Sequence, residues 1–582
     1  MTRVAGPLAA GLALAVCAIG PFALSEFHAT VAGYVGIAAI VTLGLVMLTG
    51  VSGQTSFGQA TFLGLAAYAT AVLTRAGWPP LAGLAFGLAV TGGTAFLLGL
   101  ITSRISGHYL PLATIAWCAS FYHLFGVIPA LGGFNGFGGI PPLLPGITRA
   151  GSAAVIGVVF VLAYILCANL LSSRTGRAMR ALAQGRIMAE SVGIDTARLA
   201  RSVFVLAALL AGVAGWLYAH VQQYVSPSPF GLSASIEYVF MAVIGGATHL
   251  AGAIVGAAIV VIARDQLNEW LPHLLGSSGN FETVAFSLAV ILLLQYAPRG
   301  IAPWVAQRVR RPPPASPAAA ELARRALPGR GTLVLETEAV GKRFGGLVAA
   351  HDIGLSVHAG EIVALIGPNG AGKSTTFNLI SGVLAPSTGS VRLLGQDIQG
   401  LGARAVAQRG LARTFQHVKL LPEASVLDNV ALGAHGRARA GIVRSMLRLD
   451  RIEEASLLQA ARVQAQRVGL GDVLHQPAGS LPLGRQRLVE IARGLCLDPC
   501  VFLLDEPAAG LRLQEKQTLA ALLRTLRNEG MAVLLVEHDM EFVMGLADRV
   551  VVMDFGQKIA DGRPEQVQDD RAVQEAYLGV AA

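Results

Sequence analysis

Residues 361–375, EIVALIGPNGAGKST, contain the residue types and the spacing that hold a phosphate group. An apolar stretch precedes Gly367, and Gly372, Lys373 and Ser374 complete the pattern G-x-x-x-x-G-K-[ST] ahead of a helical run. Backbone N–H groups close around the β-phosphate, Lys373 reaches the β- and γ-phosphates, and the Ser374 hydroxyl binds Mg²⁺. The pattern predicts a phosphate loop made of Gly367, Pro368, Asn369, Gly370, Ala371, Gly372, Lys373, Ser374 and Thr375.

A pair of carboxylates follows four apolar residues in VFLLDEP, residues 501–507. The apolar run predicts a buried strand whose end presents Asp505 and Glu506. We expect Asp505 to hold Mg²⁺ through a water molecule, and Glu506 to polarise the water that attacks the γ-phosphate. Combined with the phosphate loop, the pair predicts hydrolysis of a nucleoside triphosphate.

The composition indicates that the two halves of the chain lie in different surroundings. Of the 582 residues, 53% are apolar and only 14% are charged. No lysine precedes Lys342, and the acidic residues before residue 311 are Glu26, Glu190, Asp195, Glu237, Asp265, Glu269 and Glu282. The asymmetry predicts that the first half of the chain lies in lipid and the second half in water.

The net charge of +9, from 44 basic and 35 acidic residues, does not indicate a nucleic-acid partner. Many of the N-terminal arginines stand beside apolar segments, where they orient membrane spans, and no nucleic-acid-binding module is visible. The cysteines are odd in number, and free thiols are favoured over a disulfide framework or a zinc site. They are Cys17, Cys118, Cys167, Cys496 and Cys500.

Apolar runs long enough to cross a hydrocarbon core of about 30 Å predict membrane-spanning helices. We expect them at residues 6–24, 29–50, 80–102, 109–130, 151–172, 199–220 and 281–297, and at the less apolar residues 57–74, 235–247 and 250–264. These segments predict a polytopic α-helical membrane domain of about ten helices over residues 1–310. The first resembles a signal peptide but lacks a small-residue cleavage site before the next span, which favours an uncleaved helix.

The arginines predict the orientation of the spans. They crowd residues 174–201 and follow the last span at residues 299–311, and both segments are expected to be cytoplasmic. Counting spans from Arg3 places all three sites on the same side. Residues 131–145, LGGFNGFGGIPPLLP, hold too much Gly and Pro for a helix and form an external loop by this count. The loop is either a docking surface for an extracytoplasmic partner or a connector.

Two further segments interrupt the apolar pattern. Residues 50–59, GVSGQTSFGQ, put polar groups at membrane depth, which indicates either part of a transport pathway or a tight turn between two spans. Residues 174–201 have apolar residues spaced for short amphipathic helices, namely Met179, Leu182, Ile187 and Val192. This pattern has two interpretations. The helices are either a cytoplasmic element that an ATPase moves or a basic segment that orients the membrane spans, and the two interpretations are compatible.

Residues 311–332, RPPPASPAAAELARRALPGRGT, read as a Pro/Ala-rich linker. Beyond them, β-branched runs alternate with helical stretches, which is typical of an α/β domain over residues 333–582.

The order and spacing of motifs in residues 333–582 resemble the ABC transporter ATPase family. In that resemblance Phe344 matches the aromatic residue that stacks on adenine, Gln416 in RTFQ matches the lid glutamine, and His538 in LLVEHD matches the switch histidine. The resemblance implies that Gln416 contacts Mg²⁺ and reports the nucleotide to the permease, and that His538 contacts the γ-phosphate.

The family's signature segment departs from its usual LSGGQ. Residues 481–487 read LPLGRQR, and by resemblance Leu481, Gly484, Arg485 and Gln486 face a nucleotide bound by a partner ATPase. The usual serine is missing, so a hydroxyl contact to the γ-phosphate is lost. Pro482 suits the first turn of a helix, so we expect the helix itself to form.

Within this family the chain is similar to the branched-chain amino acid importers. DEPAAGL at 505–511, EHDMEFVMGLADRVVVM at 537–553 and the tail at 562–579 resemble the first ATPase of those systems. SFGQATFLGLAAYA at 56–69, GGFNG at 132–136 and the segment 177–219 resemble one of their two permeases. The resemblance implies a permease and an ATPase fused through the linker.

The resemblance also implies the partners and the cofactors, ATP and Mg²⁺. Two ATPase domains would close head to tail around two ATP molecules, so a second ATPase and a second permease are expected, as another copy or as related chains. An extracytoplasmic binding protein would deliver a small amino acid to this multi-pass protein of the cytoplasmic membrane. Import of urea or short amides, a half-size exporter and a nucleotide-gated regulator or channel are the alternatives.

Overall fold

The computed structural model describes residues 7–102, 109–275, 288, 291–292, 295–296, 300–301 and 321–578. The chain forms two compact units, named here the helical unit and the sheet unit. The helical unit comprises Met1–Ala183, Ala197–Pro312 and Ile442–Leu449, and the sheet unit comprises Gln184–Thr196, Pro313–Gly441 and Asp450–Ala582. The domain limits predicted at 310 and 333 remain predictions, and residues 311–320 of the predicted linker lie outside the described residues.

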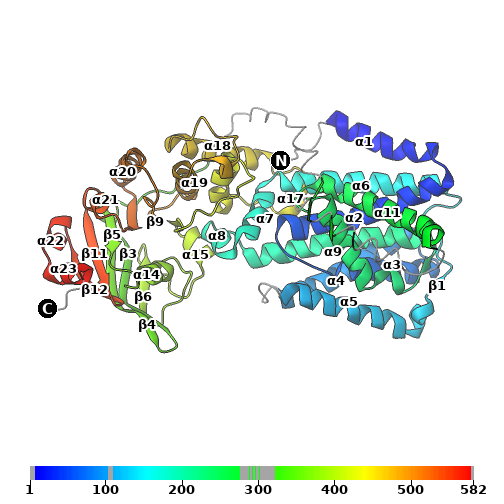
Figure 1. Ribbon diagram of the computed structural model, residues 1–582, viewed down its shortest axis with the longest axis horizontal. Coiled ribbons are helices and arrows are strands. Elements are labelled where there is room, and N and C mark those ends of the chain that lie inside the picture. Colours follow the sequence, from blue (N-terminus) through cyan, green and yellow to red (C-terminus); the bar gives the residue numbers. More distant parts are fainter. Residues whose placement is uncertain are drawn as a thin grey trace. The chain divides into compact units, whose positions relative to one another are not determined.

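The helical unit consists mainly of long α-helices (Figure 1). In its described residues these are α1 (Pro7–Ile19), α2 (Glu26–Leu45), α3 (Gln59–Arg75), α4 (Pro80–Thr102), α5 (Tyr109–Val127), α6 (Arg149–Leu171), α7 (Arg174–Gln184), α9 (Thr196–Gln222), α10 (Leu232–Gly245), α11 (Leu250–Leu275) and α17 (Ile442–Met446). Within the described residues, six stretches are long and apolar enough to cross a membrane, and they are Glu26–Val51, Pro80–Thr102, Tyr109–Val127, Arg149–Leu171, Thr196–Gln222 and Leu250–Trp270. All six coincide with predicted spans.

The remaining predicted spans differ from these six. The span expected at 6–24 is α1 followed by a 3₁₀ turn. Those expected at 57–74 and 235–247 are α3, whose 17 residues lie at the short end of the usual length of a span, and α10, whose 14 residues are fewer. The span expected at 281–297 lies largely outside the described residues. The total of about ten spans therefore stays a prediction.

Glycines allow the helices of this unit to approach closely. A Cβ atom on Gly215 of α9 would lie 2.1 Å from the carbonyl oxygen of Leu63 in α3, and one on Gly256 of α11 would lie 1.8 Å from that of Met241 in α10. Neither distance leaves space for a side chain. Small residues are the usual means of helix association in lipid, where water supplies no hydrophobic driving force between helices.

The polar segment between α2 and α3 is covered by protein. The chain leaves α2 through a π-helical turn, Val46–Val51, and begins α3 at Gln59. The N–H of Phe57 donates to Thr114 Oγ1 at 3.0 Å, and the N–H of Ala60 donates to Ser235 Oγ at 3.2 Å. Side chains of α5 and α10 thus satisfy two backbone N–H groups around the start of α3, and such groups need partners at membrane depth. A role in the transport pathway remains a prediction.

Residues 131–145 form no α-helix, which confirms the expectation from their Gly and Pro content. Two short 3₁₀ turns lead into β1 (Phe137–Gly138), which pairs antiparallel with β2 (Tyr224–Val225) after α9. The loop is thereby tied to the end of a long helix. Its external position stays a prediction.

The helical unit includes a short segment from far along the chain. Helix α17 lies in the stretch Ile442–Leu449, which belongs to this unit. Asn169 Nδ2 of α6 donates to the carbonyl oxygen of Met446 at 2.9 Å, and the hydroxyls of Thr175 and Ser445 lie 3.5 Å apart. The sequence pattern of residues 442–449 does not predict this insertion.

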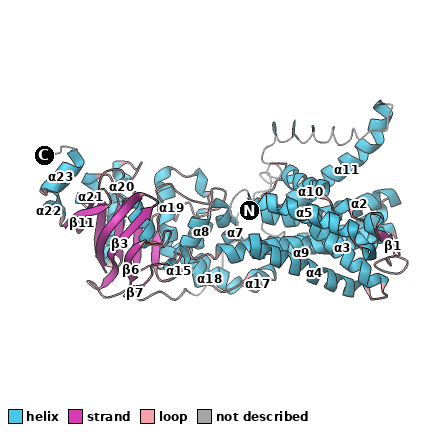
Figure 2. Cartoon of the chain, turned by 90° about the horizontal axis from the view of Figure 1, so that it is seen from below, coloured by secondary structure: helices cyan, strands magenta, loops and turns pink. Residues whose placement is uncertain are grey.

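The sheet unit contains two β-sheets, whose strands are drawn in magenta in Figure 2. The larger has the order β12-β11-β5-β10-β9-β8 and the smaller the order β4-β3-β6-β7. Their strands are β3 (Leu333–Phe344), β4 (Leu347–His358), β5 (Ile362–Ile366), β6 (Thr388–Leu393), β7 (Gln396–Asp397), β8 (Leu411–Arg413), β9 (Val501–Asp505), β10 (Ala532–Val536), β11 (Arg549–Asp554) and β12 (Gln557–Gly562). The expected α/β architecture of this half is confirmed.

Helices accompany these strands in the sheet unit. They are α8 (Arg186–Ser191), α14 (Lys373–Ile380), α15 (Ala403–Gln408), α16 (Val426–Gly433), α18 (Arg451–Arg467), α19 (Leu483–Cys496), α20 (Leu513–Asn528), α21 (Met540–Met544), α22 (Pro564–Gln568) and α23 (Arg571–Leu578). Every residue of β5, β9 and β10 is buried, as expected for parallel strands that are covered on both faces. Their apolar side chains divide between two core clusters, one on either side of the sheet.

The short helices expected in residues 174–201 are present as α7 and α8. Met179 and Val192 are buried, as their spacing predicts. The expected apolar face is wrong at Ile187, which is 45% exposed, whereas the next residue, Met188, is fully buried. Helix α8 has only six residues, too short for a periodicity to fix which face is inward.

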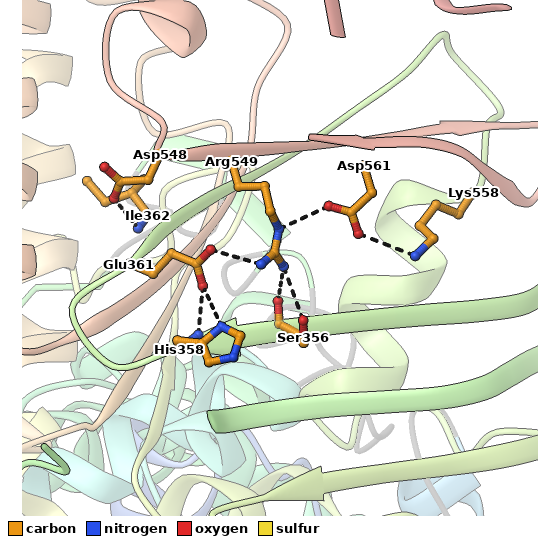
Figure 3. Close-up of polar contacts among 8 residues, drawn as sticks. All are labelled: Ser356, His358, Glu361, Ile362, Asp548, Arg549, Lys558 and Asp561. Atoms are coloured by element: carbon orange, nitrogen blue, oxygen red, sulfur yellow. Dashed lines mark hydrogen bonds and ion pairs between the residues drawn. The ribbon is translucent and has the colours of Figure 1, made fainter. Parts of the chain in front are cut away.

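A network around Arg549 holds the first residues of β5 in place (Figure 3). Arg549 Nη1 lies 2.9 Å from Glu361 Oε1, and its Nε lies 3.0 Å from Asp561 Oδ1. The neighbouring Asp548 carboxylate accepts the N–H of Ile362 at 2.9 Å. The network fixes the beginning of the strand whose other end starts the phosphate loop.

We predict that Gly215→Leu disrupts the contact between α3 and α9. Overpacking a close contact costs about 1–3 kcal/mol, so the melting temperature of the detergent-solubilised protein should fall by roughly 5 °C or more. Gly93→Leu is the matched control, because a Cβ at Gly93 of α4 meets no atom within 4 Å. An equal loss of stability in both variants would contradict the close packing described above.

Candidate nucleotide site

The phosphate loop joins β5 to α14 and depends on left-handed glycines. The φ angles of Gly367, Gly370 and Gly372 are 147°, 86° and 93°, and Gly372 is the N-cap of α14. A Cβ atom on Gly367 would lie 2.1 Å from the carbonyl oxygen of Met553. The φ angles favour glycine at all three positions, and at Gly367 and Gly372 the available space excludes a side chain as well, which explains the spacing found in the sequence.

Lys373, the first residue of α14, is buried beneath this loop. Its ammonium donates to the carbonyl oxygens of Gly367 at 2.6 Å and Pro368 at 2.8 Å. Burial lowers the pKa of Lys373, and the Glu506 carboxylate partly opposes this shift. The next residue, Ser374, is exposed, so its hydroxyl is accessible at the first turn of the helix.

Asp505 ends β9 beside a buried arginine. Arg413 Nη2 lies 3.6 Å from Asp505 Oδ2, and its Nη1 donates to Asn378 Oδ1 at 2.6 Å and to Ser381 Oγ at 2.7 Å. Burial raises the pKa of Asp505, and the charge of Arg413 opposes that rise. Arg413 therefore connects the carboxylate to α14, the helix of the phosphate loop.

Glu506 is the point at which three predicted residues meet. Gln416 Nε2 donates to Glu506 Oε1 at 3.1 Å, and His538 Nε2 lies 3.2 Å from the same oxygen. The backbone of Glu506 is left-handed, with a φ of 47°, and its N–H donates to the carbonyl oxygen of Val536 at 2.9 Å. The bend turns the side chain of Glu506 away from the line of β9, so that it is accessible to both partners.

Two residues of this cluster were not predicted from the sequence. One is Arg413, which opens the quoted segment RTFQ. The other is Glu537, only 3% exposed, whose Oε1 accepts the N–H of Ala508 at 2.6 Å and whose Oε2 accepts the N–H of His538 at 3.2 Å. Burial raises the pKa of Glu537, and these N–H groups oppose the rise. A charged residue directly after a wholly apolar strand was the available signal for Glu537.

The residues of the signature segment contact one another and nearby acidic side chains. Its helix, α19, starts immediately after Pro482, so the expectation that the helix forms is confirmed. Gln486 Nε2 donates to the carbonyl oxygen of Leu481 at 2.7 Å, and Arg485 Nη1 lies 2.9 Å from Asp472 Oδ2. A Cβ atom on Gly484 would lie 2.2 Å from Glu515 Oε1, so the glycine allows this carboxylate to approach the start of the helix.

Phe344 is an exposed aromatic residue at the end of β3. Its ring is 45% exposed at the end of β3, and Lys342 Nζ lies 5.4 Å from the ring centroid. In the described residues no hydrogen bond or ring contact joins Phe344 to the phosphate loop. Its role in stacking on adenine stays a prediction.

Sequence profiles of three families match the chain. The profile described as the permease component of the branched-chain amino acid transport system matches residues 27–297. The ABC transporter profile matches residues 350–509, and that of the branched-chain amino acid ATP-binding cassette transporters matches residues 557–582. The three matches follow the order expected from the sequence.

Individual proteins match the second half of the chain. The high-affinity branched-chain amino acid transport ATP-binding protein BraF of Pseudomonas aeruginosa is 40% identical over 251 residues, 43% of this chain and 98% of BraF. LivG of Escherichia coli K12, of the same description, is 40% identical over 242 residues, 41% of this chain and 95% of LivG. A solved nucleotide-free ATP-binding cassette from an ABC transporter is 30% identical, with a TM-score of 0.39, and covers 43% of this chain and all of that one.

A phosphate loop, an Asp-Glu pair and a histidine at the ends of neighbouring parallel strands, with a helical permease in the same chain, define an ABC transporter. It is a multi-pass membrane protein that binds ATP on the cytosolic side and couples ATP hydrolysis to transport. Within that class, the chain belongs to the branched-chain amino acid ABC transporter family.

We predict that Glu506→Gln lowers ATP hydrolysis by about a hundredfold or more, because the amide cannot accept a proton from the attacking water. The variant should retain bound ATP, since Lys373 and the loop glycines are unchanged. Phosphate release and retention of labelled ATP by the purified assembly measure the two effects. Arg467→Met, which removes an ion pair between Arg467 and Glu529 that involves no residue of the site, is the control. Hydrolysis at the normal rate in Glu506→Gln would exclude this residue as the base.

Proposed function

We propose that this chain is the fused permease and ATPase subunit of an importer for branched-chain or other hydrophobic amino acids in the cytoplasmic membrane. One observation carries the proposal: a branched-chain permease profile and a branched-chain cassette match occupy successive parts of a single polypeptide. Each half therefore indicates the same class of substrate independently of the other.

The geometry around Glu506 supports a hydrolytic role. Gln416 and His538 both contact one oxygen of its carboxylate, which leaves the other oxygen to orient and deprotonate a water molecule. Lys373 is placed to exchange its two carbonyl partners for the β- and γ-phosphates.

We also assign three oxygen groups of this chain to Mg²⁺. The Ser374 hydroxyl, the Gln416 side-chain oxygen and the Asp505 carboxylate are the donors we assign to the ion, and hard oxygen ligands are those that Mg²⁺ prefers. Asp505 is held beside α14 through Arg413, which brings its carboxylate to the helix that carries Ser374. When bound, the ion would offset the negative charge that develops on the phosphates.

We further propose that the working assembly contains a second ATPase and a second permease, together with an extracytoplasmic binding protein. The signature residues Leu481, Gly484, Arg485 and Gln486 would complete the nucleotide site of the second ATPase. In the described residues, the side chains of Arg485 and Gln486 bond to Asp472 and Leu481 rather than to the phosphate loop of their own chain, which supports this assignment. The start of α19 would contact the γ-phosphate through backbone N–H groups, without the missing serine hydroxyl.

Transmission to the permease is proposed to use the segment Gln184–Thr196. This segment lies in the range matched by the permease profile, yet it belongs to the sheet unit. Asp195 Oδ2 lies 2.8 Å from Arg404 Nη1 of α15. ATP-driven closure of two ATPase domains would move α8 with the sheet unit and switch the permease from inward to outward access, and hydrolysis would reset it.

Uptake into proteoliposomes tests the proposal directly. The complete assembly, co-purified through this chain and supplied with its binding protein, should accumulate labelled leucine, isoleucine or valine only with ATP inside. Lys373→Ala should reduce uptake to background, because it removes the charge that holds the phosphates.

Other outcomes would replace the proposal. Uptake of urea with no uptake of the amino acids would indicate an amide importer. Transport without any binding protein would indicate an exporter or a channel.

A further inference from the structure

Helix α19 carries a buried cluster of three charged residues one helical turn apart. Arg487, Glu490 and Arg493 are 6%, 2% and 2% exposed. Arg487 Nη1 lies 3.6 Å from Glu490 Oε2, and Arg493 Nη2 lies 3.3 Å from Glu490 Oε1. The carboxylate thus stands between two guanidinium groups inside the sheet unit.

The two arginines hold the backbone on either side of Gln416. Arg487 Nη1 donates to the carbonyl oxygen of Phe415 at 2.8 Å, and its Nη2 donates to the carbonyl oxygen of Gln416 itself. Arg493 Nη1 donates to the carbonyl oxygen of Lys419 at 2.6 Å. The cluster therefore fixes the residue whose side chain contacts the Glu506 carboxylate.

The same guanidinium group of Arg493 contacts the segment that comes from the permease half. Its Nη1 lies 3.8 Å from Met188 Sδ, and Met188 is fully buried on α8. The planar guanidinium group of Arg493 thereby contacts both α8 and the backbone near Gln416. Guanidinium groups keep their planar geometry, so a movement of either neighbour is transferred to the other.

Stability alone does not explain this cluster. Burial raises the pKa of Glu490, and Arg493 and then Arg487 oppose the rise. Buried ion pairs of this kind are often no more stable than well-packed apolar residues of similar volume, because desolvation offsets the attraction between the charges. The contacts to two separate segments indicate a positioning role.

We propose that Arg493, together with Glu490 and Arg487, is a positioning network that couples the place of α8 to the place of Gln416 and so to Glu506. The inference rests on the proposed function, in which α8 transmits closure to the permease. In the described part of the chain, the hydrogen bonds of the two arginines to other segments go to the backbone of Phe415, Gln416 and Lys419 and to Met188, so their effect is exerted through the backbone that they hold.

The first test measures amide hydrogen exchange in residues 184–196 with and without ATP, in the full assembly carrying Glu506→Gln to retain the nucleotide. With the network intact, ATP should change exchange in this segment. Adding Met188→Ala should reduce that ATP-dependent change about tenfold, within the range of ordinary coupling between sites. Ile187→Ala, on the exposed side of the same helix, is the control and should preserve it.

A triple variant separates positioning from folding. Arg487→Met, Glu490→Leu and Arg493→Met together leave none of these three charges buried without a partner, so the fold should persist. Glu490→Leu alone would leave the charges of Arg487 and Arg493 buried without their carboxylate partner. The triple variant should bind ATP and melt within a few degrees of the parent, but its segment 184–196 should no longer respond to ATP. In the background with Glu506 restored, the KM for ATP should stay unchanged while stimulation of kcat by loaded binding protein is lost.

Three results would overturn the inference. They are an ATP response in the triple variant equal to that of the parent, an equal loss in Ile187→Ala, and the absence of any ATP response in the parent. The exchange measurement needs no transported substrate. A failure to take up amino acids would therefore contradict the proposed function while leaving this readout to decide on the network.

Discussion

The parallel register of β5, β10 and β9 is the constraint on which the nucleotide site depends. Val536 at the end of β10 is paired with Leu365 of β5 and with Asp505 of β9. The three strands therefore end side by side at the same edge of the sheet. The phosphate loop follows β5 there, Glu506 follows β9, and His538 comes shortly after β10. A slip of one residue in any pair would separate the groups that contact the Glu506 carboxylate.

Short-range patterns made much of this site predictable. The phosphate loop, Asp505 and Glu506 were found because an apolar strand and its next few residues are contiguous in the sequence. Arg413 and Glu537 were missed because their importance lies in contacts with residues far away in the chain. The roles of all these residues in binding nucleotide and metal remain predictions.

The helices were predictable in their cores and less so at their ends. The span expected at 250–264 continues as α11 to Leu275, because Arg264 and Asp265 ended the apolar run without ending the helix. Polar residues are compatible with helix wherever that part of it leaves the hydrocarbon region. Helix α8 was too short for its buried face to be predicted. Its six residues do not form enough turns to distinguish Met188 from Ile187 as the buried position.

The exchange of segments between the units has a consequence for synthesis on the ribosome. The helical unit includes Ile442–Leu449, so it lacks one of its parts until most of the polypeptide has been translated. The sheet unit includes Gln184–Thr196, made long before its first strand. Domains usually fold one after another as they emerge. In this chain, neither unit reaches its final packing by itself, and the two must mature together at the membrane.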